Sequence, residues 1–83
     1  MAQPKVKIYT TPTCIFCKKT KEFFKANNVK YTEVDVSSDE KAANEMIKKS
    51  GQMGVPVTVV NEGKKESIIV GFDEYALKKS LHL

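Results

Sequence analysis

The sequence predicts an α/β fold, a four-stranded mixed sheet with three helices in the order β-α-β-α-β-β-α. Short runs rich in β-branched and aromatic residues alternate with segments of helical apolar spacing, and Gly, Asn and Pro separate them. The 83 residues suffice for one small domain spanning residues 1–83. A helix separates the first two strands, so they should be parallel and joined by a right-handed crossover, whereas the last two should form an antiparallel hairpin.

The first half of the chain reads as strand, helix, strand and helix. Residues 6–10 alternate polar and apolar side chains and predict a strand, and residues 31–36 predict a second one. The first helix should span residues 15–27, and the second should follow the cap residues and early acids of residues 37–40, run through Lys49 and be closed by Gly51. The side chains at the inward positions of these helices are Phe16, Thr20, Phe23, Phe24, Ala43, Met46 and Ile47.

The second half of the chain predicts a hairpin followed by a helix. Residues 57–60 are a dense β-branched run that is typical of a buried strand, residues 61–64 form a turn, and residues 66–70 return as a strand. Asp73 is placed to cap the last helix. The side chains expected to pack inward from that helix are Tyr75, Ala76, Leu77 and Leu81.

Composition and charge exclude several classes of function. The net charge of +4 comes from fourteen Lys, no Arg and ten acidic residues. Because the lysines are scattered and no Arg is present, nucleic-acid binding is not expected, and the charge favours attraction of anionic thiols. No apolar run approaches the ~20 residues of a membrane span, and no secretory signal is visible, so we expect a cytoplasmic monomer that binds no membrane.

The two cysteines, Cys14 and Cys17, lie three residues apart where the first strand meets the first helix. The N–H groups and dipole of a helix start favour negative charge, and Lys18 and Lys19 add positive potential. Thiols in such positions have pKa values lowered from ~8.5 to ~3.5–7.5. We therefore assign Cys14 as the attacking thiol and Cys17, one turn further in, as the resolving thiol.

Two structural interpretations of the cysteine pair are weaker. A disulfide over so short a loop restricts the unfolded chain little. A structural zinc site needs four ligands, and two Cys with a lone His82 cannot supply them, so no metal is expected. Dithiol–disulfide redox chemistry is the better interpretation of these residues.

Two further segments are candidate binding sites. A proline belongs at the first residue of a strand, and a cis bond between Val55 and Pro56 would turn the Val55 backbone toward Cys14, where it could pair with an extended thiol substrate. A plain trans proline is the alternative. The second segment comprises Gly71, Phe72 and Asp73, and the helix that starts after it exposes N–H donors that suit a carboxylate. This binding role is compatible with the capping role of Asp73.

Together, three segments of the chain resemble the glutaredoxin family, which has the thioredoxin-like fold. They are residues 9–17 (Tyr-Thr-Thr-Pro-Thr-Cys-Ile-Phe-Cys), 50–56 (Ser-Gly-Gln-Met-Gly-Val-Pro) and 70–73 (Val-Gly-Phe-Asp). The resemblance implies a thiol–disulfide oxidoreductase that reduces protein disulfides and glutathione mixed disulfides, with glutathione as its reductant. Its implied partners are glutathione and disulfide-containing or glutathionylated proteins.

The resemblance also implies site residues. Cys14 corresponds to the glutathionylated nucleophile, and Val55 beside a cis Pro56 corresponds to the residue that pairs with the cysteinyl backbone of glutathione. The remaining implied contacts of glutathione are Thr11, Phe16, Gln52, Gly54, Gly71, Phe72 and Asp73. Among these, Phe16 matches the usual Tyr of the groove, and Gln52 is placed to reach the glycine carboxylate of glutathione.

The chain departs from the common family pattern at several positions. Ile15 and Phe16 replace Pro and Tyr, Thr11 replaces a frequent Lys, Gly54 replaces Thr, and Val70 replaces the first of two glycines. The loss of the Lys cation at Thr11 and of the Thr hydroxyl at Gly54 should weaken glutathione binding, and each lost contact costs ~1–3 kcal/mol.

The departures leave two other functions open. The chain also resembles the small redoxins that take electrons from thioredoxin reductase and pass them to ribonucleotide reductase. A less favoured alternative is an iron–sulfur cluster carrier, in which Cys14 of two subunits and two glutathiones hold the cluster. Such carriers are mostly monothiol, so Cys17 argues against it.

Overall fold

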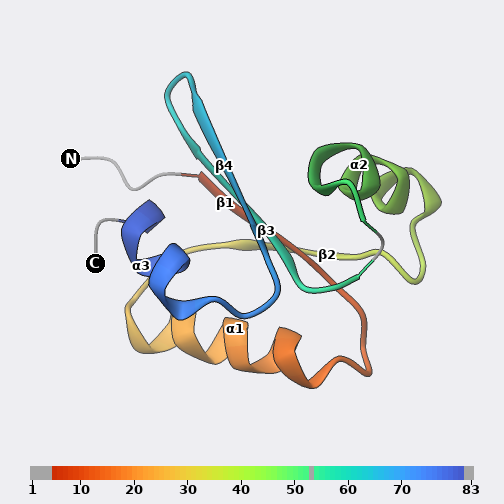
Figure 1. Cartoon of the computed structure of the whole chain (residues 1–83). Helices are drawn as coiled ribbons and strands as arrows, with labels where there is room; N and C mark the ends of the chain where they lie inside the picture. Colours follow the sequence, from red (N-terminus) through yellow and green to blue (C-terminus); the bar gives the residue numbers. More distant parts are fainter. Residues whose placement is uncertain (1–4, 53, 82–83) are drawn as a thin grey trace.

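The computed structural model describes residues 5–52 and 54–81 (Figure 1). Its elements follow the predicted order, and none of the helices in these ranges is long and apolar enough to cross a membrane. The elements are β1 (Lys5–Thr10), α1 (Ile15–Ala26), β2 (Thr32–Asp35), α2 (Glu40–Ser50), β3 (Val57–Glu62), β4 (Lys65–Val70) and α3 (Glu74–Leu81).

The four strands form one mixed sheet in the order β2-β1-β3-β4. β1 pairs parallel with β2 and antiparallel with β3, and β3 pairs antiparallel with β4. Tyr9 near the end of β1 lies opposite Val34 of β2 and Val57 of β3. The predicted parallel pair and hairpin are confirmed, and the carboxyl end of β1 lies beside the start of β3, where the loop after β1 and the loop before β3 meet.

Helices cover both faces of the sheet, with α1 and α3 on one side and α2 on the other (Figure 1). Successive strand residues point to opposite faces, so Ile8 packs toward α1 and α3 whereas Tyr9 packs toward α2. The first core comprises Val6, Ile8, Phe23, Phe24, Val29, Val60, Ile69, Leu77 and Leu81. The second comprises Tyr9, Ala42, Met46, Val57 and Val59.

The capping residues of α2 explain where this helix begins and ends. The carboxylate of Asp39 accepts the N–H of Ala42 at 3.1 Å, which satisfies one of the unpaired donors of the first turn. At the other end Gly51 has φ 74° and donates its N–H to Ile47 O at 2.8 Å. This left-handed conformation suits a glycine, so the predicted closure of the helix is confirmed.

Several detailed predictions are wrong. Tyr75 is 77% exposed, whereas Leu77 and Leu81 are the buried residues among those described on α3. Phe16 shares the helical spacing of Thr20, Phe23 and Phe24, yet it is 56% exposed. The hairpin turn is shorter than predicted, because β3 continues to Glu62 and β4 begins at Lys65.

Smaller differences concern burial in α2 and the strand and helix ends. The fully buried alanine of α2 is Ala42, whereas Ala43 is partly exposed. β2 lacks the first and last residues predicted for it, and α1 ends at Ala26 with Asn27 as its cap. Each shift is one or two residues, within the usual variation of element ends.

Thr58 carries a buried hydroxyl that has no hydrogen-bond partner among the described residues. It lies two residues before Val60 on β3, so its side chain points to the face covered by α1 and α3. Burying an unpaired hydroxyl costs ~1–3 kcal/mol. We therefore expect Thr58→Val to raise the free energy of unfolding by about 1 kcal/mol in urea denaturation.

A matched control is Thr20→Val on α1. The Thr20 hydroxyl is equally buried but donates to Phe16 O at 2.8 Å, so its removal should give no such gain. An equal stabilisation of both variants would contradict the explanation for Thr58, because it would reflect the added apolar surface alone.

Candidate active site

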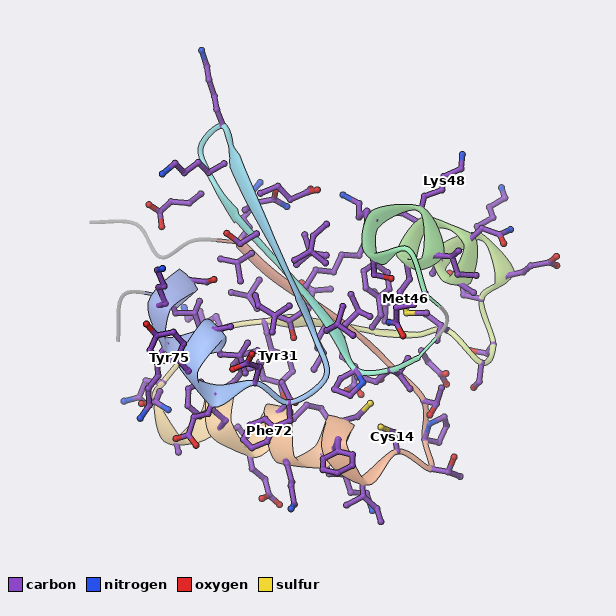
Figure 2. All side chains as sticks on the ribbon, in the orientation of Figure 1. Cys14, Tyr31, Met46, Lys48, Phe72 and Tyr75 are labelled. Atoms are coloured by element: carbon purple, nitrogen blue, oxygen red, sulfur yellow. The ribbon has the colours of Figure 1, made fainter. Side chains whose placement is uncertain are left out.

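Cys14 is the N-cap residue of α1. Its φ of −86° and ψ of 115° are extended, as an N-cap requires, and its Sγ accepts the backbone N–H of Cys17 at 3.2 Å. The same sulfur donates its proton to Val55 O at 3.7 Å. Cys14 is partly exposed, and Figure 2 shows it at the open end of the molecule, where α1 begins. The sulfur therefore combines access for a substrate with a helix terminus that favours negative charge.

Cys17 lies one turn further along α1 and is only 1% exposed. Burial and, to a smaller extent, the hydrogen bond with Cys14 together raise the pKa of the Cys17 thiol to about 12, against opposing effects of the Thr11 backbone and Lys21. Cys17 is therefore a protonated thiol at neutral pH. Both cysteines are free thiols in this structure. The predicted division between an accessible and a shielded sulfur matches this geometry.

The loop before β3 lies against Cys14. The bond between Val55 and Pro56 is cis, as the resemblance to glutaredoxins implies, and the Val55 carbonyl faces the Cys14 sulfur. No hydrogen bond among the described residues uses the Val55 N–H. The carbonyl of Pro56 accepts the N–H of Gly71 at 2.8 Å, which ties this loop to the one before α3. The structure thus brings the segments 50–56 and 70–73 into contact with each other, and it brings the segment 50–56 into contact with Cys14.

Gln52 and Gly54 bind each other. The Gln52 side chain donates to Gly54 O and accepts from Gly54 N, both at 2.8 Å. A Cβ at Gly54 would lie 2.7 Å from Gln52 Oε1, so the Thr that the family often has here would displace this amide from its present position. The prediction that Gln52 reaches a carboxylate of glutathione stays a prediction, and it requires this pair of hydrogen bonds to open.

The segment before α3 is built around a helix cap. The carboxylate of Asp73 accepts the N–H of Ala76 at 3.1 Å, and its carbonyl accepts the N–H of Leu77, so the predicted capping role is confirmed. Phe72 is partly buried and packs edge-on against Phe23 of α1 at 6.3 Å between ring centroids. Gly71 has φ 78°, which favours glycine. This segment is therefore fixed in place beside α1.

The remaining predicted residues surround the start of α1. The carbonyl of Thr11 accepts the N–H of Cys14 at 3.3 Å, so its contact in this structure is through the backbone. Phe16 is exposed next to the cysteines, with Lys19 Nζ 5.5 Å from its ring centroid. His82 lies outside the described residues.

Lys21, Glu33 and Thr10 form a polar cluster at the face of α1 that carries Cys17, and the sequence did not predict it. Lys21 of α1 forms an ion pair of 2.9 Å with Glu33 of β2, and the same carboxylate oxygen accepts the Thr10 hydroxyl at 2.8 Å. The spacing of Lys21, four residues after Cys17 on one helix, could have indicated it. The pairing with β2 could not be read from the sequence, because residues 21 and 33 meet only in the folded chain.

The fold and the site together define a class of protein. The protein has a thioredoxin-like fold in which a helix begins at an accessible cysteine, a second, buried cysteine follows one turn later, and a cis-proline loop faces the first sulfur. The glutaredoxin family model matches residues 6–64. The chain belongs to the glutaredoxin family, whose members are in general thiol–disulfide oxidoreductases.

Individual relatives agree with this assignment. The uncharacterized glutaredoxin-like 8.6 kDa protein in the rubredoxin operon of Clostridium pasteurianum is 45% identical over 74 residues, which cover 89% of this chain and 93% of that protein. Among solved structures, the thioredoxin-like protein BC3987 has a TM-score of 0.80 and 35% identity over 93% of this chain and 100% of its own. Methanoredoxin of Methanosarcina acetivorans has a TM-score of 0.85 and 27% identity over 98% and 87% of the two chains.

Proposed function

We propose that the protein is a glutathione-dependent thiol–disulfide oxidoreductase that reduces protein disulfides and glutathione mixed disulfides. The observation that carries this proposal is the pairing of a partly exposed Cys14 Sγ, which accepts an N–H at the start of α1, with a buried, protonated Cys17 one turn away. An accessible nucleophile and a shielded resolving thiol are what disulfide exchange needs. We place this reaction in the cytoplasm, in a monomer of one domain spanning residues 1–83.

The reaction has four exchange steps, two that reduce the substrate and two that reduce the enzyme. The Cys14 thiolate attacks a substrate disulfide, forms a mixed disulfide and releases one substrate thiolate, which takes up a proton. For a protein disulfide, Cys17 then attacks Cys14 Sγ, its proton passes to the second leaving thiolate, and the dithiol of the enzyme ends as a disulfide. Two glutathione molecules return the enzyme to the dithiol and leave as oxidised glutathione, so two electrons pass from glutathione to the substrate.

Several groups around Cys14 support glutathione as the reductant. The carbonyl of Val55 lies against Cys14 Sγ, and its N–H, unused among the described residues, suits pairing with the peptide backbone of glutathione. The start of α3, fixed by Gly71 and Phe72, offers N–H donors for the γ-glutamyl carboxylate. Phe16 is exposed where the groove wall is expected. Thr11, Gln52, Gly54 and Asp73 complete the proposed contacts.

A second candidate is a redoxin that receives electrons from thioredoxin reductase and passes them to an enzyme such as ribonucleotide reductase. The engagement of Gln52 with Gly54 favours it, because the amide proposed for a glutathione carboxylate already has two partners of its own. Thr11 in place of the frequent Lys also removes a cation from the groove. Both features lower the expected affinity for glutathione without affecting the cysteine chemistry.

The electron source distinguishes the two candidates. Reduction of hydroxyethyl disulfide is followed through NADPH oxidation, once with glutathione and glutathione reductase and once with thioredoxin reductase alone. We expect turnover that depends on this protein with glutathione, and Cys14→Ser gives the background rate in each assay. Turnover with thioredoxin reductase and none with glutathione would overturn the proposal in favour of the second candidate.

A further inference from the structure

An ion-paired cation lies on the same face of α1 as the buried sulfur. Lys21 follows Cys17 by four residues on α1, so both side chains lie on one face of the helix. The Nζ of Lys21 is 2.9 Å from Glu33 Oε2, and Thr10, which is buried at the end of β1, donates its hydroxyl to the same oxygen at 2.8 Å. The ammonium group is therefore tied to two strands of the sheet.

The ion pair is partly shielded and charged. The Lys21 side chain is 27% exposed. The hydrogen bond from Lys21, followed by that from Thr10, holds the pKa of Glu33 below its usual value, and the hydrogen bond to Glu33 raises the pKa of Lys21. At neutral pH both partners are therefore ionised, and the Lys21 cation keeps its position beside α1.

The surroundings of Cys17 oppose its ionisation. Burial and Cys14 both disfavour a thiolate at this position. Among the described residues the charged or titratable groups that act on Cys17 are Cys14 and Lys21, whereas Glu33 and Tyr31 act on Lys21. Two groups favour negative charge on the Cys17 sulfur: the Thr11 backbone through a hydrogen bond and, with a smaller effect, the Lys21 cation. A resolving thiol develops that charge during its attack, and Lys21 is the one cation that acts on it among the described residues.

We propose that Lys21 promotes the resolving step by stabilising the negative charge that develops on Cys17 Sγ, and that Glu33 and Thr10 are positioning residues that hold Lys21 for this purpose. The inference rests on the proposed function, because it concerns the second exchange of that reaction. In this step the Cys17 sulfur forms a bond to Cys14 Sγ, the bond from Cys14 to the substrate sulfur breaks, and the Cys17 proton passes to the departing thiolate. The dithiol loses two electrons and the substrate disulfide gains them.

The test follows the two exchanges separately with dithiobis-nitrobenzoate. Attack by Cys14 releases a first thionitrobenzoate, and resolution by Cys17 releases the second. We expect Lys21→Gln to slow the second release about five- to tenfold and to leave the first unchanged, as the loss of one partly screened charge predicts. Lys21→Gln should slow the second release by the same factor at every pH below the Cys17 pKa. In that range the ratio of the Cys17 thiolate fractions of variant and wild type does not change with pH.

Matched variants separate charge from packing. Lys21→Arg keeps the cation and should resolve within about twofold of wild type. Lys25→Gln, an exposed lysine one turn further along α1, should change neither release. The double variant Lys21→Gln/Glu33→Gln removes both charges and should stay as slow as Lys21→Gln. Recovery of the wild-type rate in the double variant would overturn the proposal, because the slowing would then come from an unpaired Glu33.

The first release also monitors folding, since it requires an intact start of α1 in the same molecule. A second release at the wild-type rate in Lys21→Gln would overturn the proposal. Dithiobis-nitrobenzoate replaces both glutathione and the protein substrate, so the result is independent of the electron source. Failure of turnover with glutathione would therefore reject the proposed function and leave the role of Lys21 to be decided by this measurement.

Discussion

Cys14→Ser is expected to abolish disulfide reduction, with a loss of at least about a thousandfold in turnover. Serine keeps the N-cap of α1 but lacks a sulfur that can be exchanged. Cys17 cannot replace it, because that thiol is buried and protonated at neutral pH. The measurement is reduction of a glutathione mixed disulfide and of a protein disulfide by purified variants, and residual turnover near wild type would contradict the assignment of the nucleophile.

Cys17→Ser is the matched variant for that experiment. It should spare reduction of glutathione mixed disulfides, where a second glutathione releases the first from Cys14. It should impair reduction of protein disulfides, because their release needs the resolving thiol. An equal loss of both activities would contradict the division of roles between the two sulfurs.

The reduced protein should lose stability steeply at alkaline pH. Burial raises the pKa of Cys17 from an ordinary value of about 9 to about 12, and burial together with the hydrogen bond to Glu45 raises the pKa of Tyr9. Above about pH 9 the unfolded chain releases the Cys17 proton and the folded chain keeps it, so the unfolded state binds fewer protons. The free energy of unfolding should then fall by about 1.4 kcal/mol per pH unit toward pH 12 for this group, and Tyr9 adds to the slope from about pH 10.

Urea unfolding at about pH 7, 9, 10 and 11 in the presence of a phosphine reductant measures this slope. Cys17→Ala and Tyr9→Phe each remove one of the two groups, so each should have a shallower decline than wild type. A free energy of unfolding that is unchanged between about pH 7 and 11 would refute the prediction.

Local patterns were sufficient to predict the order of the elements and most of the core. The alternation in residues 6–10 and the dense β-branched run of residues 57–60 predicted central strands, because such side chains pack well on a pleated sheet. The spacing of Phe23 and Phe24 predicted the buried face of α1. These features succeed because the residues that determine them are close together in the chain.

Failures occurred where a side chain lies at the margin of its element. Tyr75 has an aromatic ring in a short helix, yet it is exposed, whereas Phe72 and Ala76 pack against the core of α1 and α3. Phe16 continues the spacing of Thr20, Phe23 and Phe24 on α1, yet it too is exposed. Helical periodicity identifies a face and does not show how far along the helix the sheet extends.

The chemistry of the site divides in the same way. Cys14, Cys17, Pro56 and Asp73 could be identified from the sequence, because the cysteine spacing, the proline before a strand and the acidic cap each have a local physical reason. The hydrogen-bond partners of the site residues could not be identified from the sequence. A carboxylate of glutathione, for example, was an equally good candidate partner for the Gln52 amide. Its pairing with Gly54 depends on the path of the loop.

By itself, the sequence determined the α/β fold and the position of the two thiols at a helix start, because helix dipoles, caps and side-chain periodicity operate over a few residues. Only the tertiary structure decided how strongly the second thiol is desolvated and which charge compensates for it. The Cys17 sulfur is buried by the sheet beneath α1, and the Lys21 cation is held by Glu33 from a different strand. Burial and ion pairing depend on distances through space, which residues far apart in the chain acquire only on folding.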